Sequence, residues 1–395
     1  MLKHLLLIPP LILLVFAAPS KQLLKLPVSV SKYKYEKLII AASIARLNQR
    51  YGKPSQLFNQ PLANYDSGNF YYEGMIGTTG LYKLIMDSGN INFWVFDASC
   101  SNNGRSCPAQ NKYNYTSSVK GLKCNETVSF YNNGYSIVGN VYTDSFCFDT
   151  NSNNYACTDQ YQSFAGALSD PDRNGFDYDG VLGLNYNSIS GSMPQPMKQI
   201  FDKSTCAHKL FALWMDRSQN NAYKGGELHI CDTDSTRFNG PITYAQVNSW
   251  SNWRIPIDSV AVNQKHVADL VDAIIDTGTH YIFGPPDQVA QLQKLIGATP
   301  IGGGEYEVDC GKISLLPDIA VKISGTDFVL KGADYIVQTI ENGILICFSG
   351  IVGSDIPAPA GPAWVFGNLF VGRFYTIFDF ENGRLGFANA TYTSF

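Results

Sequence analysis

Short apolar runs that alternate with polar residues recur along most of this chain, and Gly, Asn, Asp and Ser separate them. Alternation with a period of two predicts half-buried β-strands, for example at residues 128–131, 136–142 and 328–330. Helical character occurs in two stretches, residues 33–50 and 286–296. The hydrophobic pattern therefore predicts an all-β protein with few helices.

Two of the apolar runs, far apart in the chain, end in an acidic residue, a small hydroxyl residue and glycine. The motifs are Asp87-Ser88-Gly89 and Asp276-Thr277-Gly278-Thr279. Each is followed, after a similar interval, by two apolar residues and a glycine, Gly183 or Gly367, which indicates a duplicated chain. A carboxylate in such a turn has hydrogen-bond donors nearby. Two such turns facing each other would let two carboxyl groups share one proton, which activates water without a metal ion.

The composition and the N-terminus indicate a large folded protein on the secretory pathway. The 395 residues are 45% hydrophobic and only 16% charged, which is enough for two packed domains. Lys3 and His4 precede an apolar run, residues 5–16, which predicts a signal peptide over residues 1–17. That run is too short to span a membrane and no later run is long enough, so we expect no membrane span and a secreted or lysosomal location. Three sequons predict N-glycosylation on this path: Asn114, Asn125 and Asn389.

Charge is distributed unevenly between the start of the chain and the rest. Residues 1–60 contain nine Lys and Arg but one acid, Glu36, whereas acidic residues predominate in the remainder. A basic leader on an acidic body predicts a pro-segment, residues 18–60, held as an intramolecular lid that loosens when carboxylates protonate in acid. The acidic body would repel phosphates, so no nucleic-acid partner is expected.

Nine cysteines on a secretory path predict disulfides, with one thiol left over because the number is odd. Cys147 and Cys157 bracket a polar segment and can close a hairpin, and Cys206 is expected to pair with Cys231. An alternative for the second pair is a zinc site with four ligands: Cys206, His208, His229 and Cys231. The oxidising compartment favours the disulfide, so we expect no metal site.

The two Asp motifs and several further segments resemble the pepsin-like aspartic proteases, and the resemblance covers nearly the whole chain. The further segments are Pro61-Leu62-Ala63-Asn64-Tyr65, Asp179-Gly180-Val181-Leu182-Gly183-Leu184, Gly225-Gly226-Glu227-Leu228, Trp364-Val365-Phe366-Gly367-Asn368, Phe374-Tyr375-Thr376-Ile377-Phe378-Asp379 and Arg384-Leu385-Gly386-Phe387-Ala388. The resemblance implies a bilobal all-β fold with the active-site cleft between two β-rich lobes. The N-terminal lobe would span residues 61–245 and the C-terminal lobe residues 246–395.

The resemblance also implies an activity. Asp87 and Asp276 would hold a water molecule between them; one ionised carboxylate takes its proton, and the other, protonated, stabilises the oxyanion that develops on a peptide carbonyl. The substrate would be a polypeptide, cleaved at acidic pH. The protein would be made as a zymogen whose other partner is its own pro-segment. It needs no cofactor, and a monomer is expected.

Five neighbours of the two acids are implied to support the active-site turns. Ser88 and Thr277 would lock the turns together through hydroxyl-to-backbone hydrogen bonds. Gly89 and Gly278 allow close backbone approach. Thr279 would hydrogen-bond the second catalytic carboxylate.

The resemblance carries over to the remaining cysteines as well. Cys310 and Cys347 match a disulfide of the second lobe. Cys100 matches the first cysteine of a small loop, with Cys107 or Cys124 as its partner, and the other of these two is the expected free thiol.

Three positions around the catalytic pair depart from the family pattern. Asn90 replaces a hydroxyl residue beside the first acid, and Asn368 stands where an Asp is usual. Loss of that carboxylate is expected to shift the pH optimum, in a direction that the pattern leaves open. His280 replaces a common Ser, and we expect it to be partly exposed at the cleft edge.

The largest departure is in the flap, the hairpin that covers substrate in this family. Asn132 occupies the position of a tyrosine that would bond to Trp94. Tyr131 is one residue away and faces the other side of its strand, unless a register change at the Asn133-Gly134 turn restores it. Tyr135, across the hairpin tip, is another substitute.

These observations predict an aspartic endopeptidase. The alternative is a protease-like protein that binds peptides but barely cleaves them, which the three asparagines motivate: Asn90, Asn132 and Asn368. A glycosidase that uses Asp87 and Asp276 as acid and base is a third hypothesis, but it explains neither the flanking turns nor the pro-segment.

Overall fold

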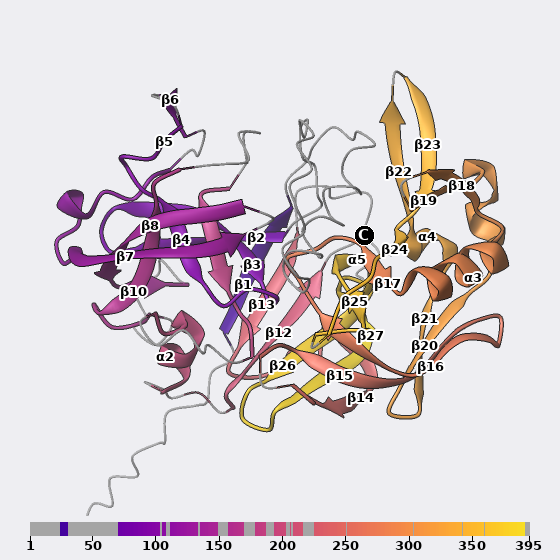
Figure 1. Cartoon of the computed structure of the whole chain (residues 1–395). Helices are drawn as coiled ribbons and strands as arrows, with labels where there is room; N and C mark the ends of the chain where they lie inside the picture. The colour runs from indigo at the N-terminus through magenta and orange to yellow at the C-terminus, as the bar shows by residue number, and fades with distance from the viewer. Residues whose placement is uncertain are drawn as a thin grey trace, which may run out of the picture.

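The computed structural model describes residues 24–30, 70–102, 105–107, 111–132, 135–148, 157–169, 178–186, 193–202, 206, 208–215, 225–249, 251–302, 304–341, 343–358 and 360–391. The predicted signal peptide, the helix expected over residues 33–50 and the expected start of the mature chain lie outside this part. Figure 1 shows two β-rich lobes, one built from the first half of the chain and one from the second. No helix in the described part is long and apolar enough to cross a membrane.

The described strands of the first half are β1 (Leu24–Val30), β2 (Phe70–Ile76), β3 (Gly80–Asp87), β4 (Phe93–Phe96), β5 (Ser101–Asn102), β6 (Arg105–Ser106), β7 (Leu122–Asn132), β8 (Tyr135–Asp144), β9 (Phe146–Cys147), β10 (Gln162–Ala167), β11 (Gly180–Gly183), β12 (Leu210–Met215), β13 (Gly226–Ile230) and β14 (Phe238–Gln246). Those of the second half are β15 (Arg254–Val262), β16 (Lys265–Ile275), β17 (Ile282–Gly284), β18 (Thr299–Gly302), β19 (Glu305–Glu307), β20 (Ile319–Ile323), β21 (Thr326–Leu330), β22 (Ile336–Glu341), β23 (Ile344–Ser349), β24 (Ile351–Gly353), β25 (Trp364–Phe366), β26 (Phe374–Asp379) and β27 (Arg384–Ala390). The helices are α2 (Pro196–Asp202), α3 (Pro286–Ile296), α4 (Gly332–Tyr335) and α5 (Asn368–Val371), with 3-10 turns η1 (Tyr115–Ser117) and η3 (Cys310–Leu315).

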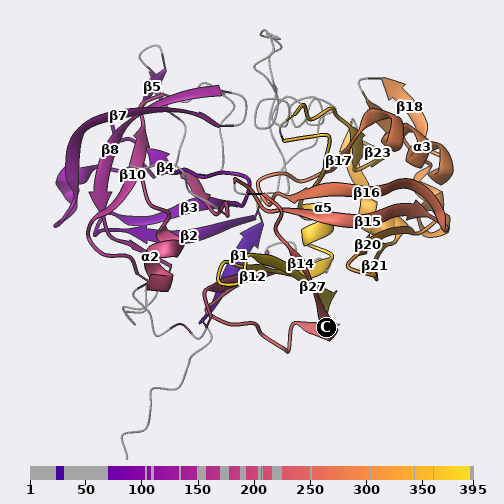
Figure 2. The same cartoon turned by 60° about the horizontal axis from the view of Figure 1, so that its bottom comes forward.

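One large sheet joins the two lobes. Its strand order is β14-β27-β26-β12-β13-β1-β2-β3-β11-β4-β10-β8-β7, and β9 pairs with β2. The last strands of the chain, β26 and β27, therefore lie beside strands of the first half, and β1 lies between β13 and β2. Figure 2 shows β27 beside β14 and β1 beside β2. The second lobe adds a seven-stranded sheet, β21-β20-β15-β16-β25-β17-β24, and a four-stranded sheet, β18-β19-β23-β22.

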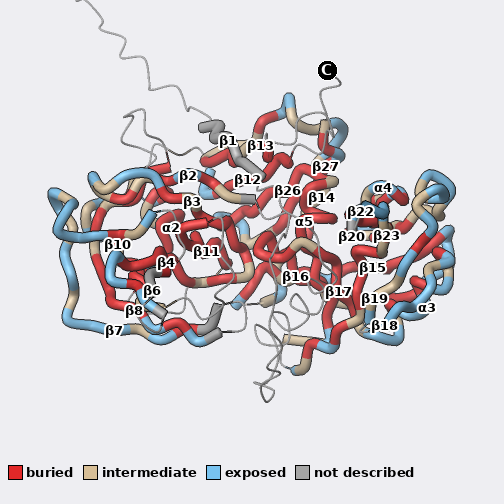
Figure 3. Tube along the Cα trace, turned by 90° about the horizontal axis from the view of Figure 1, so that it is seen from above, coloured by how far each residue is buried: buried red, intermediate tan, exposed pale blue. Residues whose placement is uncertain are grey.

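The repeated sequence pattern corresponds to a repeated strand arrangement. β11 runs parallel to β3 and places Gly183 opposite Asp87. β25 runs parallel to β16 and places Phe366 opposite Ile275, one residue before Asp276. The expectation of a duplicated chain is confirmed by these registers, and in both pairs the ends that carry these residues are buried. Figure 3 shows buried chain through the middle of both lobes and exposed segments at their rims.

The predicted strands and the helix after the second motif are confirmed. Residues 128–131, 136–142 and 328–330 lie in β7, β8 and β21, and α3 has the predicted bounds. Pro286 begins α3, where a missing N–H costs nothing, and Gly297 ends it with a φ of 77°. Its buried face, which includes Val289, Leu292 and Ile296, packs into the core. The all-β bilobal class is correct.

Four disulfides link the described cysteines. They join Cys100 to Cys107, Cys147 to Cys157, Cys206 to Cys231 and Cys310 to Cys347. Cys124 is the free thiol. Since Cys206 and Cys231 are bonded to each other, the four-ligand zinc alternative is wrong.

A partly buried ionic network lies on and beside β13, in the sheet that joins the lobes. The Glu227 carboxylate accepts hydrogen bonds from Arg237 Nε at 2.8 Å and from its Nη2. His229 Nε2 lies 2.9 Å from Glu227 Oε2, and its Nδ1 lies 2.7 Å from the Tyr375 hydroxyl. Burial raises the pKa of Glu227, but the hydrogen bonds from His229 and Arg237 outweigh it and lower that pKa to about 2. Glu227 therefore stays ionised in acid and binds β13 to its neighbours.

We expect Glu227→Gln to lower the free energy of unfolding by about 2 kcal/mol at about pH 6, because it removes the partly buried charged partner of Arg237. A depressed carboxyl pKa adds stability above the unfolded value of 4.5, and this stability is lost as pH falls toward 2. The difference between variant and parent should therefore shrink across that window in urea titrations. The exposed Glu73→Gln serves as the control. A difference that does not change with pH would contradict this account.

Candidate active site

The two predicted acids lie at equivalent positions in the two halves. Asp87 ends β3, and Asp276 directly follows β16. Both are buried, with 2% and 0% of their surface exposed. Each carboxylate accepts a 3.0 Å hydrogen bond from a backbone N–H two residues later, at Gly89 and Gly278. Each acid is thus fixed by its own turn.

The two turns are interlocked by their hydroxyl residues. The Ser88 hydroxyl donates to the carbonyl of Ile275 at 2.9 Å and accepts from the Thr277 N–H at 3.0 Å. Symmetrically, the Thr277 hydroxyl donates to the carbonyl of Met86 at 2.7 Å and accepts from the Ser88 N–H at 2.9 Å. Both hydroxyls are buried, so all four bonds are shielded from water.

The interlock brings the first carboxylate against the second turn. A Cβ added to Gly278 would lie 2.3 Å from Asp87 Cγ and Oδ1, closer than any side chain allows. Only glycine therefore fits at residue 278. The N–H of the same glycine donates to Asp276 Oδ1, so this one residue adjoins both acids.

The fourth residue of each motif differs between the halves. The backbone N–H groups of Asn90 and Thr279 bond the carbonyls of Asp87 and Asp276 at 3.1 and 3.3 Å, so the two turns match. The Asn90 side chain accepts a 2.9 Å bond from the N–H of Asn92 and closes its own turn. The side chain of Asn90 thus helps to hold the first turn in shape.

Asn368, at the start of α5, contacts the turn that holds Asp276. It is 4% exposed, and its Nδ2 donates to the carbonyl of Thr277 at 3.2 Å. Its backbone N–H donates to the carbonyl of Thr279 at 2.9 Å. His280 is partly exposed, as expected.

The predicted flap is the β7–β8 hairpin. Its ladder pairs Asn132 with Tyr135, Tyr131 with Ser136 and Phe130 with Ile137, without a shift between Thr127 and the tip. The described ladder thus contains no register change in this stretch that would bring residue 131 to the ladder face of Phe130. Position 132 shares a ladder face with Phe130, whose ring centroid lies 6.2 Å from that of Trp94.

Trp94 is 1% exposed, and its Nε1 has no hydrogen-bond partner among the described residues. The indole packs against Phe96, Phe130 and Tyr178. Buried N–H groups in proteins normally donate a hydrogen bond, so an acceptor placed near this atom would stabilise it.

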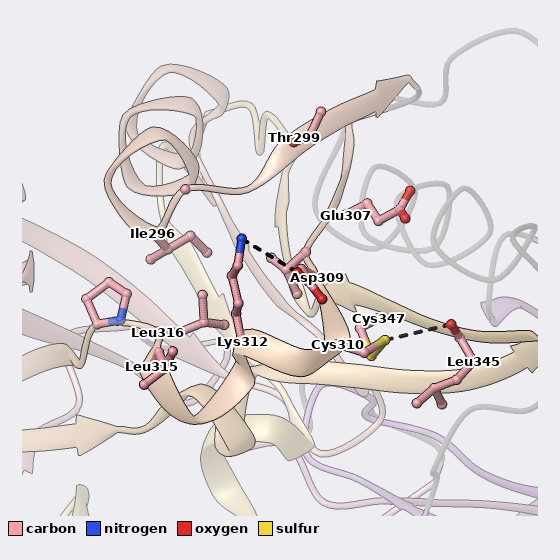
Figure 4. A pocket seen from close by; sticks show the side chains of 13 residues that line it. Ile296, Thr299, Glu307, Asp309, Cys310, Lys312, Leu315, Leu316, Leu345 and Cys347 are labelled. Atoms are coloured by element: carbon pink, nitrogen blue, oxygen red, sulfur yellow. Dashed lines mark hydrogen bonds and ion pairs between the residues drawn. A yellow bond between two sulfur atoms is a disulfide. The ribbon is translucent and has the colours of Figure 1, made fainter.

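A separate pocket lies in the second lobe, around η3 (Figure 4). It has a volume of about 850 Å³, and Lys312 and Asp309 form an ion pair at its wall. None of the residues that line it belongs to the two catalytic motifs. We therefore place the candidate active site at the two interlocked turns.

The bilobal β-rich fold and its two interlocked Asp turns point to a class of protein, the aspartic hydrolases. The model of the eukaryotic aspartyl protease family matches residues 70–390. The chain is 36% identical over 343 residues to aspartic protease 3 of Caenorhabditis elegans, covering 84% of this chain and 85% of the relative. It is 31% identical over 403 residues to cathepsin D of Homo sapiens, covering 96% and 98%. It is 32% identical over 408 residues to cathepsin D of Canis lupus familiaris, covering 97% and 99%.

The chain therefore belongs to the eukaryotic aspartyl protease family, and it is an aspartic endopeptidase of the pepsin-like type. Two features near the site were missed in the sequence. The first is the strand β1 inside the expected pro-segment, although its apolar residues alternate. The second is the contact of Phe130 with Trp94, which the period-two pattern from Phe130 to Asn132 would have indicated.

We expect Gly278→Ala to lower kcat by about 100-fold or more, because the added methyl group displaces the Asp87 carboxylate by roughly 1 Å. Gly311→Ala is the matched control, since a Cβ there meets only Asp309 Oδ1, at 3.4 Å. Both variants would be compared by kcat on one peptide and by circular dichroism. Unchanged turnover in a folded Gly278→Ala protein would show that the carboxylate does not need this position.

Proposed function

We propose that this protein cleaves polypeptides at acidic pH with Asp87 and Asp276 as its catalytic pair. The observation that carries the proposal is the reciprocal bonding of Ser88 and Thr277, which supports a fixed pair of carboxyl groups. The ionised carboxyl group would take a proton from a water molecule, which attacks the peptide carbonyl. The protonated group would donate to the carbonyl oxygen as negative charge develops there. When the tetrahedral intermediate collapses, the C–N bond breaks and the departing amine takes up a proton.

We further propose that the chain is made as a zymogen and that residues 18–60 are its pro-segment. β1 lies within this range and pairs with β13 and β2, and β2 pairs with β3, which ends at Asp87. Loss of the pro-segment would thus remove a strand from the sheet that carries the first catalytic acid. Another extended segment would then be needed to satisfy the exposed edges.

A secreted or lysosomal location is supported by the apolar N-terminus and the four disulfides, which persist in oxidising compartments. All three sequon asparagines are exposed, as glycosylation requires: Asn114, Asn125 and Asn389. We propose these as glycosylation sites, and a monomer as the working state.

The test of the proposed activity is incubation of the purified precursor between about pH 3 and 6 with denatured haemoglobin or a quenched apolar peptide. We expect the precursor to shorten and the substrate to be cleaved, because protonation both releases the leader and loads the pair with one proton. Asp87→Asn and added pepstatin should each abolish cleavage, whereas the exposed Asp287→Asn should not.

The second candidate function is that of a peptide-binding protein with impaired turnover, which Asn90, Asn132 and Asn368 motivate. No cleavage by a folded protein freed of its leader, together with retained pepstatin binding, would favour it over the protease.

The flap gives a finer prediction. Asn132→Tyr should raise kcat/KM by about ten-fold, because a hydroxyl on the ladder face of Phe130 can accept from Trp94 Nε1 and fix the hairpin for the transition state. Tyr131→Phe, on the opposite ladder face, is the control and should have little effect. If Asn132→Tyr left kcat/KM unchanged, the tyrosine of the family pattern would not be needed in this chain.

A further inference from the structure

Asn368 holds the second catalytic turn by two hydrogen bonds from one residue. Its backbone N–H donates to the carbonyl of Thr279 at 2.9 Å. Its side-chain Nδ2 donates to the carbonyl of Thr277 at 3.2 Å. These carbonyls flank Gly278, the residue that lies against the Asp87 carboxylate. A shift of Asn368 would therefore move the part of the turn that separates the two acids.

The chemistry of this contact requires a donor at the side chain. A carbonyl oxygen can only accept a hydrogen bond, so the atom that faces Thr277 must carry a hydrogen. An amide nitrogen does so at every pH. A carboxyl group of the same shape does so only while it is protonated, and its ionised form would place a negative oxygen against the carbonyl oxygen.

The surroundings of the amide oxygen, Oδ1, indicate whether a negative charge would be stabilised at this position. Asn368 Oδ1 is buried and has no hydrogen-bond partner among the described residues. A carboxylate at this position would therefore lack donors to stabilise it, and burial would disfavour its charged form. The site suits a neutral donor.

We propose that Asn368 is a positioning residue that keeps the Asp276 turn in its catalytic geometry independently of pH, and so extends peptide cleavage toward neutral pH. The proposal rests on the proposed role of Asp276 as a catalytic acid. The sequence pattern leaves open whether Asn368 shifts the pH optimum upward or downward, and the proposal predicts an upward shift. Here the amide extends the alkaline side of the activity profile relative to a carboxyl group.

The charged groups around Asn368 are few. Asp276 and His280 lie on the catalytic turn itself, and Asp87 lies against Gly278. Among the elements packed against α5, β17 and β25 contain no charged residue, α4 contains Asp334, which pairs with Arg373 at 3.4 Å, and β26 ends in Asp379, which pairs with Arg384 at 2.7 Å. Each of the last two acids is paired with an arginine, so the Asp276 turn is the part of the structure that a carboxyl group at residue 368 would contact.

The experiment compares Asn368→Asp and Asn368→Leu with the parent, all activated in the same way, by kcat and KM between about pH 3 and 6.5 on one quenched peptide. For Asn368→Asp we expect a kcat close to that of the parent at the acid end, where the carboxyl group still donates. At the upper end its kcat should be about ten-fold lower, since one hydrogen bond is lost and a charge is buried. KM should change little.

Asn368→Leu keeps the approximate shape but has no donor. Its kcat should be lowered by a similar factor at every pH, so the ratio to the parent stays flat. An Asn368→Asp profile that superimposes on the parent, or one whose alkaline limb moves upward, would overturn the proposal. The upward shift would mean that the added charge acts through the field on the catalytic pair instead of through the turn. A parent-like Asn368→Leu would overturn it as well, and this variant serves if Asn368→Asp does not fold.

Failure of the proposed function has a different signature. If the parent does not cleave, pepstatin affinity measured across the same pH range replaces kcat as the readout. The positioning role then predicts that Asn368→Asp loses affinity only at the upper end. Equal affinities of variant and parent throughout would overturn it.

Discussion

The structure depends on the reciprocal bonds between Ser88 and Thr277. Each hydroxyl donates to a carbonyl of the opposite half and accepts an N–H from it, so neither turn can move without the other. Because the bonds are buried, water does not compete for them. The close approach of Gly278 to the Asp87 carboxylate follows from this interlock, and it brings the turn that holds Asp276 against the first acid.

The interlock also ties the chemistry to the sheet that joins the lobes. Asp87 ends β3, at the point where the two turns interlock. In the strand order, β3 is two strands away from β1 and three from β13. The network of Glu227, Arg237 and His229 lies on or beside β13, and its carboxylate remains ionised in acid. If a pro-segment that contains β1 leaves, the sheet next to β13 must rearrange. The ion pair of Glu227 and Arg237 beside it stays formed in acid.

Much of this architecture could be predicted from the sequence. Period-two alternation identified β7, β8 and β21, the helical stretch at residues 286–296 predicted α3, and the repeated motifs indicated equivalent turns. Their interlock was expected from the resemblance and is present in the hydrogen bonds. These features depend on neighbouring residues or on repeated motifs, so they can be recognised in one sequence.

What could not be predicted depends on contacts between distant segments. The choice of Cys107 over Cys124 as the partner of Cys100 depends on chain folding, since both lie close in sequence. The register of the hairpin ladder depends on how the chain turns between its two strands, and a single added residue there would have changed it. The direction in which Asn368 acts needed the identity of its partner, the carbonyl of Thr277.

The central claim is that two interlocked carboxyl groups act as one unit with one shared proton. The most direct measurement is the pH dependence of kcat/KM for the activated protein, taken together with that of the Asp87→Asn and Asp276→Asn variants. The account predicts a bell-shaped profile with both limbs on the acid side of neutrality, and no turnover in either variant. A profile with a single limb, or turnover that survives the loss of either carboxyl group, would contradict it.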